Sequence, residues 1–281
     1  MTKLLVIGET LIDLVPGPNG REAVLGGSPY NVAIGLGRLG AKVSIATSLS
    51  HDLDGQRFKA ALEADGVDLS CVGIVNKPSP TALVEEGTKE SGPRYVFTLS
   101  GTAFDEPAPL PLPWSDDLAH IHAGSIAAIL GPMAHSVLDA FAAARGKRTT
   151  SYDPNIRPMI TPDRDKTRSD VEARVALADI VKASEEDLEW LYPDHQPHES
   201  ILNWLALGPK LMILTRGGKG AEAFTAKDHL IVPAPAITVG DTVGAGDSLM
   251  SALLFAMERD GALGATPVAW TQSAIGKWLS F

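Results

Sequence analysis

Short apolar stretches of β-forming residues alternate with helical patterns along most of this sequence, and this alternation constrains the fold more than any other feature. Strands are predicted at residues 4–7, 43–47, 120–123, 149–152, 180–182 and 211–215. Helices are predicted at residues 28–39, 56–64, 133–144, 168–178, 185–191, 199–207, 249–259 and 271–281. Such an order is typical of an α/β fold, in which a mostly parallel sheet carries helices on both faces.

Two stretches, residues 10–15 and 81–97, are rich in β-formers but have no helix between their strands. The second contains turn residues at 86–93, which predicts a hairpin. We therefore expect a small separate β-sheet, from about residues 10–25 and 74–100, that acts as a lid. The 281 residues, 44% of them hydrophobic, are enough for one domain with one large core.

The net charge of −10 gives no general attraction to nucleic acids or anionic membranes, so we expect neither as a partner. No stretch approaches the ~20 apolar residues of a membrane span, and the apolar run at the start is short for a signal peptide. Cys71 is the only cysteine, so an intrachain disulfide is impossible. A cytoplasmic protein is the expectation.

The most informative segment runs from Asp241 to Ser248 and reads Asp-Thr-Val-Gly-Ala-Gly-Asp-Ser. Small residues before a helix expose backbone N–H groups at its positive end, where an anion binds. A carboxylate at that point, Asp247, can accept a proton from a hydroxyl nucleophile. The alternative is an ordinary turn in which Asp247 caps the helix.

This segment, followed by Ser-Ala-Leu-Leu at residues 251–254, resembles the C-terminal signature of the ribokinase-like (PfkB) carbohydrate kinases. The resemblance implies phosphoryl transfer from ATP, with Asp247 as the catalytic base. It also implies that the backbone of Gly244, Ala245 and Gly246 forms an anion hole. Asp241, at the start of the segment, is expected on the nucleotide side.

The family's N-terminal motif, a Gly-Gly pair followed by Asn and a helix, is matched by Gly26, Gly27 and Asn31. In the family this region and the Asp after the first strand, here Asp13, hold sugar hydroxyls. Phe97, in the expected lid, is assigned to the sugar site as well. Taken singly, Asp13 is equally a loop carboxylate and Asn31 a helix-cap residue.

The segment Asp-Pro-Asn-Ile-Arg-Pro at 153–158 follows a predicted strand and resembles an element of fructokinase-like and ketodeoxygluconate-kinase-like members. Ligands bind at the carboxyl ends of strands in open α/β sheets. Asn155 and Arg157 are therefore expected to contact the sugar or the transferring phosphate. A surface salt bridge is the alternative role for Arg157.

Two further segments are expected to hold the nucleotide and its metal. Lys182, Ser184 and Asp187 align with the family's Asn-x-x-Glu element, although both defining residues differ. Asp187 is expected to hold Mg²⁺ through water, or Ser184 simply caps a helix with an acidic first turn.

The second segment contains Thr215, Gly217 and Gly220, and it resembles the family's nucleotide loop. An ordinary glycine-rich turn is the alternative. A monovalent cation such as K⁺ is a further candidate cofactor.

Residues 35–40 spell Gly-x-Gly-x-x-Gly, the dinucleotide-binding pattern, but the pattern requires a strand before it. Here a helix precedes and a strand follows, which favours helix packing and helix termination over an NAD-dependent dehydrogenase.

The expected activity is transfer of the γ-phosphate of ATP to a sugar hydroxyl. Fructose is the expected sugar, and 2-dehydro-3-deoxygluconate and ribose remain alternatives. A non-catalytic sugar-binding or regulatory protein is the alternative of another class, and retention of Asp247 argues against it. Members usually continue beyond a helix like 271–281 with residues that line the adenine pocket, so that pocket is completed further on or is open on one side. A homodimer through the lid is also expected.

Overall fold

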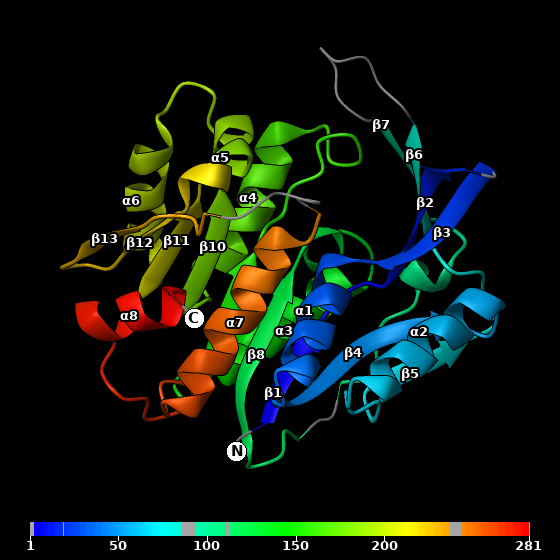
Figure 1. Cartoon of the computed structure of the whole chain (residues 1–281), viewed down its shortest axis with the longest axis horizontal. Helices are drawn as coiled ribbons and strands as arrows, with labels where there is room; N and C mark the ends of the chain where they lie inside the picture. Colours follow the sequence, from blue (N-terminus) through cyan, green and yellow to red (C-terminus); the bar gives the residue numbers. More distant parts are fainter. Residues whose placement is uncertain (1–2, 19, 86–93, 111–112, 237–242, 281) are drawn as a thin grey trace.

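The computed structural model describes residues 3–18, 20–85, 94–110, 113–236 and 243–280, and within these residues its main element is a nine-stranded sheet (Figure 1). The strand order is β13-β12-β11-β10-β9-β8-β1-β4-β5. Pairing is parallel from β5 to β11, and β12 and β13 extend the sheet in antiparallel pairing. The strands are β1 (Lys3–Ile7), β4 (Lys42–Ser50), β5 (Val72–Val75), β8 (Leu118–Gly124), β9 (Thr149–Asp153), β10 (Ile180–Ser184), β11 (Leu211–Thr215), β12 (Ala221–Phe224) and β13 (His229–Val232).

Helices cover both faces of this sheet, because the side chains of each strand point alternately to two hydrophobic cores. In β1, Leu4 and Val6 belong to one core, and Leu5 and Ile7 belong to the other. The first core lies under α1 (Ser28–Arg38), α2 (Leu53–Ala64), α7 (Ala245–Arg259) and α8 (Gln272–Leu279). The second lies under α3 (Met133–Ala144), α4 (Arg164–Val175), α5 (Glu185–Leu191) and α6 (Pro197–Leu207). The predicted fold class is confirmed.

A separate four-stranded sheet, in the order β3-β2-β6-β7, stands beside the large one (Figure 1). Its strands are β2 (Leu11–Gly17), β3 (Gly20–Gly26), β6 (Thr81–Glu85) and β7 (Arg94–Thr98). β6 and β7 form the predicted hairpin, whose turn at 86–93 lies outside the described residues. The sequence predicts that the second segment of the small sheet begins at about residue 74. It begins at Thr81, because β5, which includes residue 74, pairs with β4 in the large sheet.

Three helices begin about one turn earlier than predicted, and α7 is one of them, with Ala245 as its first residue. The other two are α2, which begins at Leu53, and α4, which begins at Arg164. In α2 and α4 an aspartate caps the helix, and its carboxylate accepts a hydrogen bond from a backbone N–H in the first turn. Asp52 accepts from Gly55 at 2.8 Å, and Asp163 accepts from Lys166 at 3.0 Å. The first turn of α4 is polar and the only apolar side chain in the first turn of α2, Leu53, is 72% exposed, so apolar periodicity does not reveal either turn.

The glycines of the Gly-x-Gly-x-x-Gly pattern lie at the end of α1, as the helix-packing interpretation predicts. A Cβ at Gly35 would lie 2.4 Å from the Ser251 Oγ of α7, so the two helices cross closely there. A Cβ at Gly37 would lie 2.3 Å from the Asp65 carbonyl oxygen. Gly40 has φ +85° and follows the helix end. The pattern therefore serves packing and helix termination.

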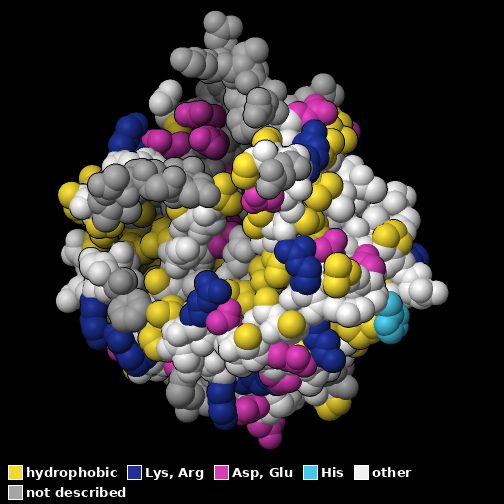
Figure 2. All heavy atoms as spheres, turned by 45° about the vertical axis from the view of Figure 1, so that its right-hand side comes forward, with side chains coloured by type: hydrophobic (Ala, Val, Ile, Leu, Met, Phe, Trp, Pro, Cys, Tyr) yellow, Lys and Arg dark blue, Asp and Glu magenta, His cyan; other side chains and the backbone are white. Residues whose placement is uncertain are grey.

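The surface carries charges of both signs. On the face in Figure 2, lysine and arginine side chains are interspersed with aspartate and glutamate. In the described part of the chain, no helix combines the length and the apolar character that crossing a membrane requires.

Candidate active site

Asp247 lies in the first turn of α7, and α1 holds its carboxylate in place. The Ser28 hydroxyl donates to Oδ1 at 2.7 Å, and the Asn31 amide donates to Oδ2 at 2.8 Å. Only 7% of Asp247 is exposed. Both donors come from the first turn of α1, which the close crossing at Gly35 keeps against α7. The carboxylate is thus fixed in orientation while it still faces a cleft.

The N-terminus of α7, where an anion hole is expected, lies at the cleft. Gly244 precedes the helix with φ 72°, in the left-handed region that favours glycine. The first amides of a helix have no carbonyl partner within it, so those of Ala245, Gly246 and Asp247 are available to an anion. A Cβ at Gly246 would lie 2.8 Å from the Lys182 Nζ, so a side-chain ammonium adds positive charge at this helix end.

Lys182 is held by Asp153, a residue that sequence reasoning did not assign to the site. The two side chains form an ion pair of 2.6 Å and are 7% and 1% exposed. Burial would lower the pKa of Lys182, but Asp153, Asp187 and Asp247 raise it overall. Burial raises the pKa of Asp153 to about 6, an effect that Lys182 partly offsets. At neutral pH the ammonium is therefore charged and aimed at the α7 N-terminus.

Asp187 is tied into local structure through both of its oxygens. Oδ2 accepts from the Ser184 backbone N–H at 2.9 Å and from the Ser184 hydroxyl at 2.8 Å. Oδ1 accepts from the Ile156 backbone N–H at 2.7 Å. Ser184 caps α5 in a full capping box, as the alternative interpretation of this element predicts. Because both oxygens of Asp187 already accept hydrogen bonds, the carboxylate is better suited to accept a hydrogen bond from a metal-bound water than to coordinate the metal directly.

The loops after β9 and β11 supply two further groups of predicted residues. Asn155 adopts φ 40°, and its side-chain oxygen accepts from the Arg157 guanidinium at 2.8 Å. Gly220 has φ +99°, and a Cβ there would lie 2.1 Å from the Val232 carbonyl oxygen. Only glycine fits at this position, so the close return of the chain after β11 depends on it.

Most predicted residues line one cleft of about 1010 Å³ at the carboxyl ends of β10 and β11 and the N-terminus of α7. Those lining it are Asn155, Arg157, Lys182, Ser184, Asp187, Thr215, Gly217, Gly220, Gly244, Ala245, Gly246 and Asp247. Asp241 lies outside the described residues. Tyr95 of β7 also lines the cleft, and sequence reasoning missed it.

The predicted sugar-side residues lie around β2 and the start of α1. A Cβ at Gly26 would lie 2.3 Å from the Asp13 Oδ2, and one at Gly27 would lie 2.7 Å from the Glu9 carbonyl oxygen. Burial raises the pKa of Asp13 to about 6, and the positive charge of Arg157 partly offsets this. Asp13 therefore interacts electrostatically with Arg157, which lines the cleft. Asn31 is connected to the cleft by its hydrogen bond to Asp247.

Phe97 is part of the packing under the small sheet, together with Leu11, Ala82 and Ile126. Its ring stacks on that of Tyr95 with centroids 6.2 Å apart. Among the described residues that line the cleft, the aromatic contribution of β7 is Tyr95, and Phe97 lies beside it on the same face of the strand.

Comparison with known proteins gives a consistent result. Residues 1–265 match the pfkB family of carbohydrate kinases. A fructokinase from Rhizobium leguminosarum bv. trifolii is 35% identical over 277 residues, which cover 95% of this chain and 83% of the relative.

Two solved structures share the fold. A fructokinase double mutant from Vibrio cholerae O395, bound to fructose, ADP and a potassium ion, has a TM-score of 0.84 and 24% identity. The alignment covers 99% of this chain and 89% of that one. An aminoimidazole riboside kinase from Salmonella enterica has a TM-score of 0.82 and 24% identity, covering 99% and 90%.

Proposed function

The chain belongs to the pfkB family of carbohydrate kinases, and we propose that it is an ATP-dependent fructokinase, which transfers the γ-phosphate of ATP to a hydroxyl of fructose. The observation that carries the proposal is the carboxylate of Asp247. Ser28 and Asn31 orient it at the N-terminus of α7, where the helix amides and Lys182 concentrate positive charge.

The residues of this chain divide the chemistry between them. Asp247 accepts the proton of the attacking hydroxyl, which makes that oxygen a better nucleophile. The amides of Ala245 and Gly246, with the Lys182 ammonium, stabilise negative charge on the transferring phosphoryl group. The small sheet covers the sugar and limits the access of water, which would otherwise hydrolyse ATP.

The first turn of α5 fits a hydrated metal ion. Glu185, Glu186 and Asp187 line the cleft together, and both Asp187 oxygens already accept protein hydrogen bonds. These carboxylates would hold Mg²⁺ through its water ligands, since Mg²⁺ usually keeps several of them. Bound there with ATP, the ion would neutralise phosphate charge. A K⁺ requirement and a homodimer through the small sheet stay predictions.

Fructose is favoured as the sugar because the Rhizobium fructokinase is similar over nearly this whole chain. Likeness of fold alone does not choose a sugar, since kinases for fructose and for aminoimidazole riboside match about equally well. The test is a panel of fructose, ribose, 2-dehydro-3-deoxygluconate and aminoimidazole riboside, with ADP release coupled to NADH oxidation. We expect kcat/KM to be highest for fructose. A higher kcat/KM for another sugar of the panel would change the assigned substrate but not the assignment as a sugar kinase. If none of the four sugars is phosphorylated, a non-catalytic binding protein is favoured.

Asp13 should make sugar binding depend on pH. Its carboxylate accepts stronger hydrogen bonds from sugar hydroxyls when it is ionised, and burial raises its pKa to about 6. We expect KM for fructose to rise as the pH falls below about 6, by at most roughly tenfold for each pH unit, while kcat changes less. In Asp13→Asn, KM should be high and nearly independent of pH. An unchanged KM for the unmodified enzyme between about pH 5 and pH 8 would contradict the assignment.

A further inference from the structure

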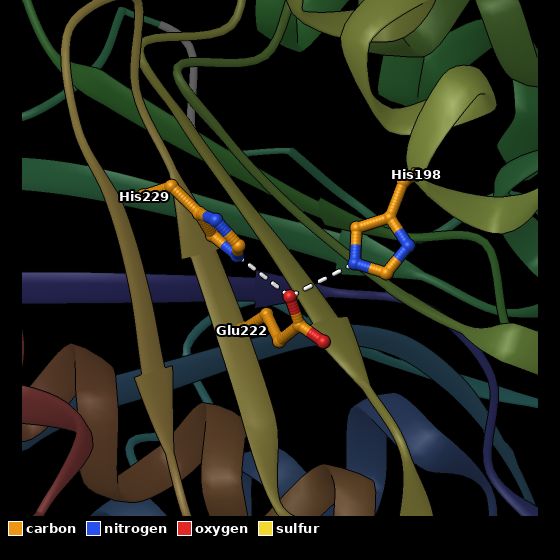
Figure 3. A group of neighbouring side chains, drawn as sticks. All are labelled: His198, Glu222 and His229. Atoms are coloured by element: carbon orange, nitrogen blue, oxygen red, sulfur yellow. Dashed lines mark hydrogen bonds and ion pairs between the residues drawn. The ribbon is translucent and has the colours of Figure 1, made fainter.

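Three side chains of metal-binding type meet at the edge of the large sheet, and none of the three residues lines the cleft itself. They are His198 from α6, Glu222 from β12 and His229 from β13 (Figure 3). The His198 Nε2 lies 2.9 Å from the Glu222 Oε2, and the His229 Nε2 lies 2.6 Å from the same oxygen. One donor atom from each of three elements thus points to one place.

Packing fixes the two imidazole rings. β12 and β13 pair Phe224 with His229, and their rings stack at 4.3 Å with an interplanar angle of 11°. The His198 ring meets the same phenylalanine edge-on at 5.7 Å. The side chains of His198 and His229 are 46% and 45% exposed, so solvent and ions reach the point where they meet.

Glu222 is held as a carboxylate with one oxygen turned to the histidines. The residue is 1% exposed, and its Oε1 pairs with the Arg216 guanidinium. The Arg216 guanidinium is a permanent positive charge beside Glu222, and its ion pair with Oε1 does not depend on the two histidines. An ionised carboxylate is the form that coordinates a metal.

We propose that His198, Glu222 and His229 bind a divalent transition-metal ion of the zinc type. The ion would be coordinated by both Nε2 atoms and by Oε2, with water completing its shell. Two imidazoles and one carboxylate are a ligand set of zinc sites, whereas Mg²⁺ and Ca²⁺ select oxygen ligands. Tetrahedral ligands with bonds of about 2.0–2.2 Å lie roughly 3.3 Å apart, so ring movements of about half an ångström would admit the ion.

The site would join α6 to the two antiparallel edge strands, and its ligands are separate from the catalytic residues. Arg216 links the two regions, because it pairs with Glu222 on one side and with Glu185 at the cleft on the other. The metal need not take part in phosphoryl transfer, so its binding is measured directly.

The experiment uses untagged protein treated with a chelator, because a histidine tag would itself bind metal. Co²⁺ is titrated in and the visible d–d absorption of the bound ion is followed, and Zn²⁺ binding is measured by calorimetry. We expect one ion per chain and a four-coordinate cobalt spectrum without a thiolate band. His198→Gln and His229→Gln should each weaken Zn²⁺ binding more than about 10-fold, since loss of an outer-shell partner alone already costs about that much.

The matched control is His51→Gln, which removes an exposed histidine elsewhere and should leave the affinity unchanged. Both site histidines are about half exposed, so their variants should fold, and circular dichroism checks this. Absence of Zn²⁺ binding by the unmodified protein would overturn the proposal. So would equal affinity in the double variant H198Q/H229Q, which would place the ion elsewhere.

Discussion

Replacing Asp247 with Asn is expected to lower kcat by about 10²- to 10⁴-fold while fructose still binds. Proton acceptance by a positioned base contributes an effect of that size, and a neutral amide cannot supply it. The amide fits the same place, because its oxygen accepts from the Asn31 amide and the Ser28 hydroxyl turns to accept from its NH₂ group. Steady-state kinetics with coupled ADP detection measures kcat, and calorimetry measures fructose binding.

The companion variant Ser28→Ala tests whether the orientation of the base matters separately from its presence. It removes one of the two donors and keeps the carboxylate, so its loss of kcat should be much smaller than that of Asp247→Asn. The melting temperatures of Asp247→Asn and Ser28→Ala should lie within a few degrees of that of the unmodified enzyme, which shows that both variants are folded. Turnover by Asp247→Asn within about tenfold of normal, only ~1.4 kcal/mol of barrier, would show that another group is the base.

Those parts of the fold that depend on local pattern could be predicted from the sequence. In the described part of the chain, the order of the eight α-helices and of six of the nine strands of the large sheet follows from apolar periodicity, which does not predict the short strands β5, β12 and β13. The glycine-rich segment before α7 is a contiguous motif. The position of Asp247 at the start of a helix, beside exposed amides, follows from that motif alone. Likewise, Ser184 was identifiable as a helix cap because the capping box lies within four residues.

Contacts between distant segments could not be predicted in the same way. The Ser28 to Asp247 hydrogen bond joins residues 219 positions apart, and it depends on how closely α1 and α7 cross. The Asp153 to Lys182 ion pair requires β9 and β10 to be neighbours in parallel register, which single strands do not reveal. Tyr95 and Phe97 are aromatic residues on the same face of β7, so only the packed structure shows which of them lines the cleft.

The Asp153 to Lys182 pair yields the largest expected effect on stability. Lys182→Met removes the ammonium and leaves the Asp153 carboxylate, which is 1% exposed, without its countercharge. Losing one partner of a buried pair costs about 3–5 kcal/mol of unfolding free energy. The loss should grow as pH rises, because the pKa of Asp153 is raised by burial to about 6 and a protonated carboxyl needs no countercharge. Urea unfolding at about pH 5 and pH 8 measures both effects.

Two further variants separate charge from packing and from catalysis. Lys210→Met removes an ammonium from a pair with Asp179, but that lysine side chain is 61% exposed, so a loss below about 1 kcal/mol is expected. The double variant D153N/K182M restores charge balance and should recover most of the stability lost in Lys182→Met. Its kcat/KM for ATP should stay low, because no ammonium remains at the α7 N-terminus. If Lys182→Met has an unfolding free energy no lower than that of Lys210→Met, the buried ion pair does not stabilise the fold. The role of Lys182 would then be phosphate binding alone.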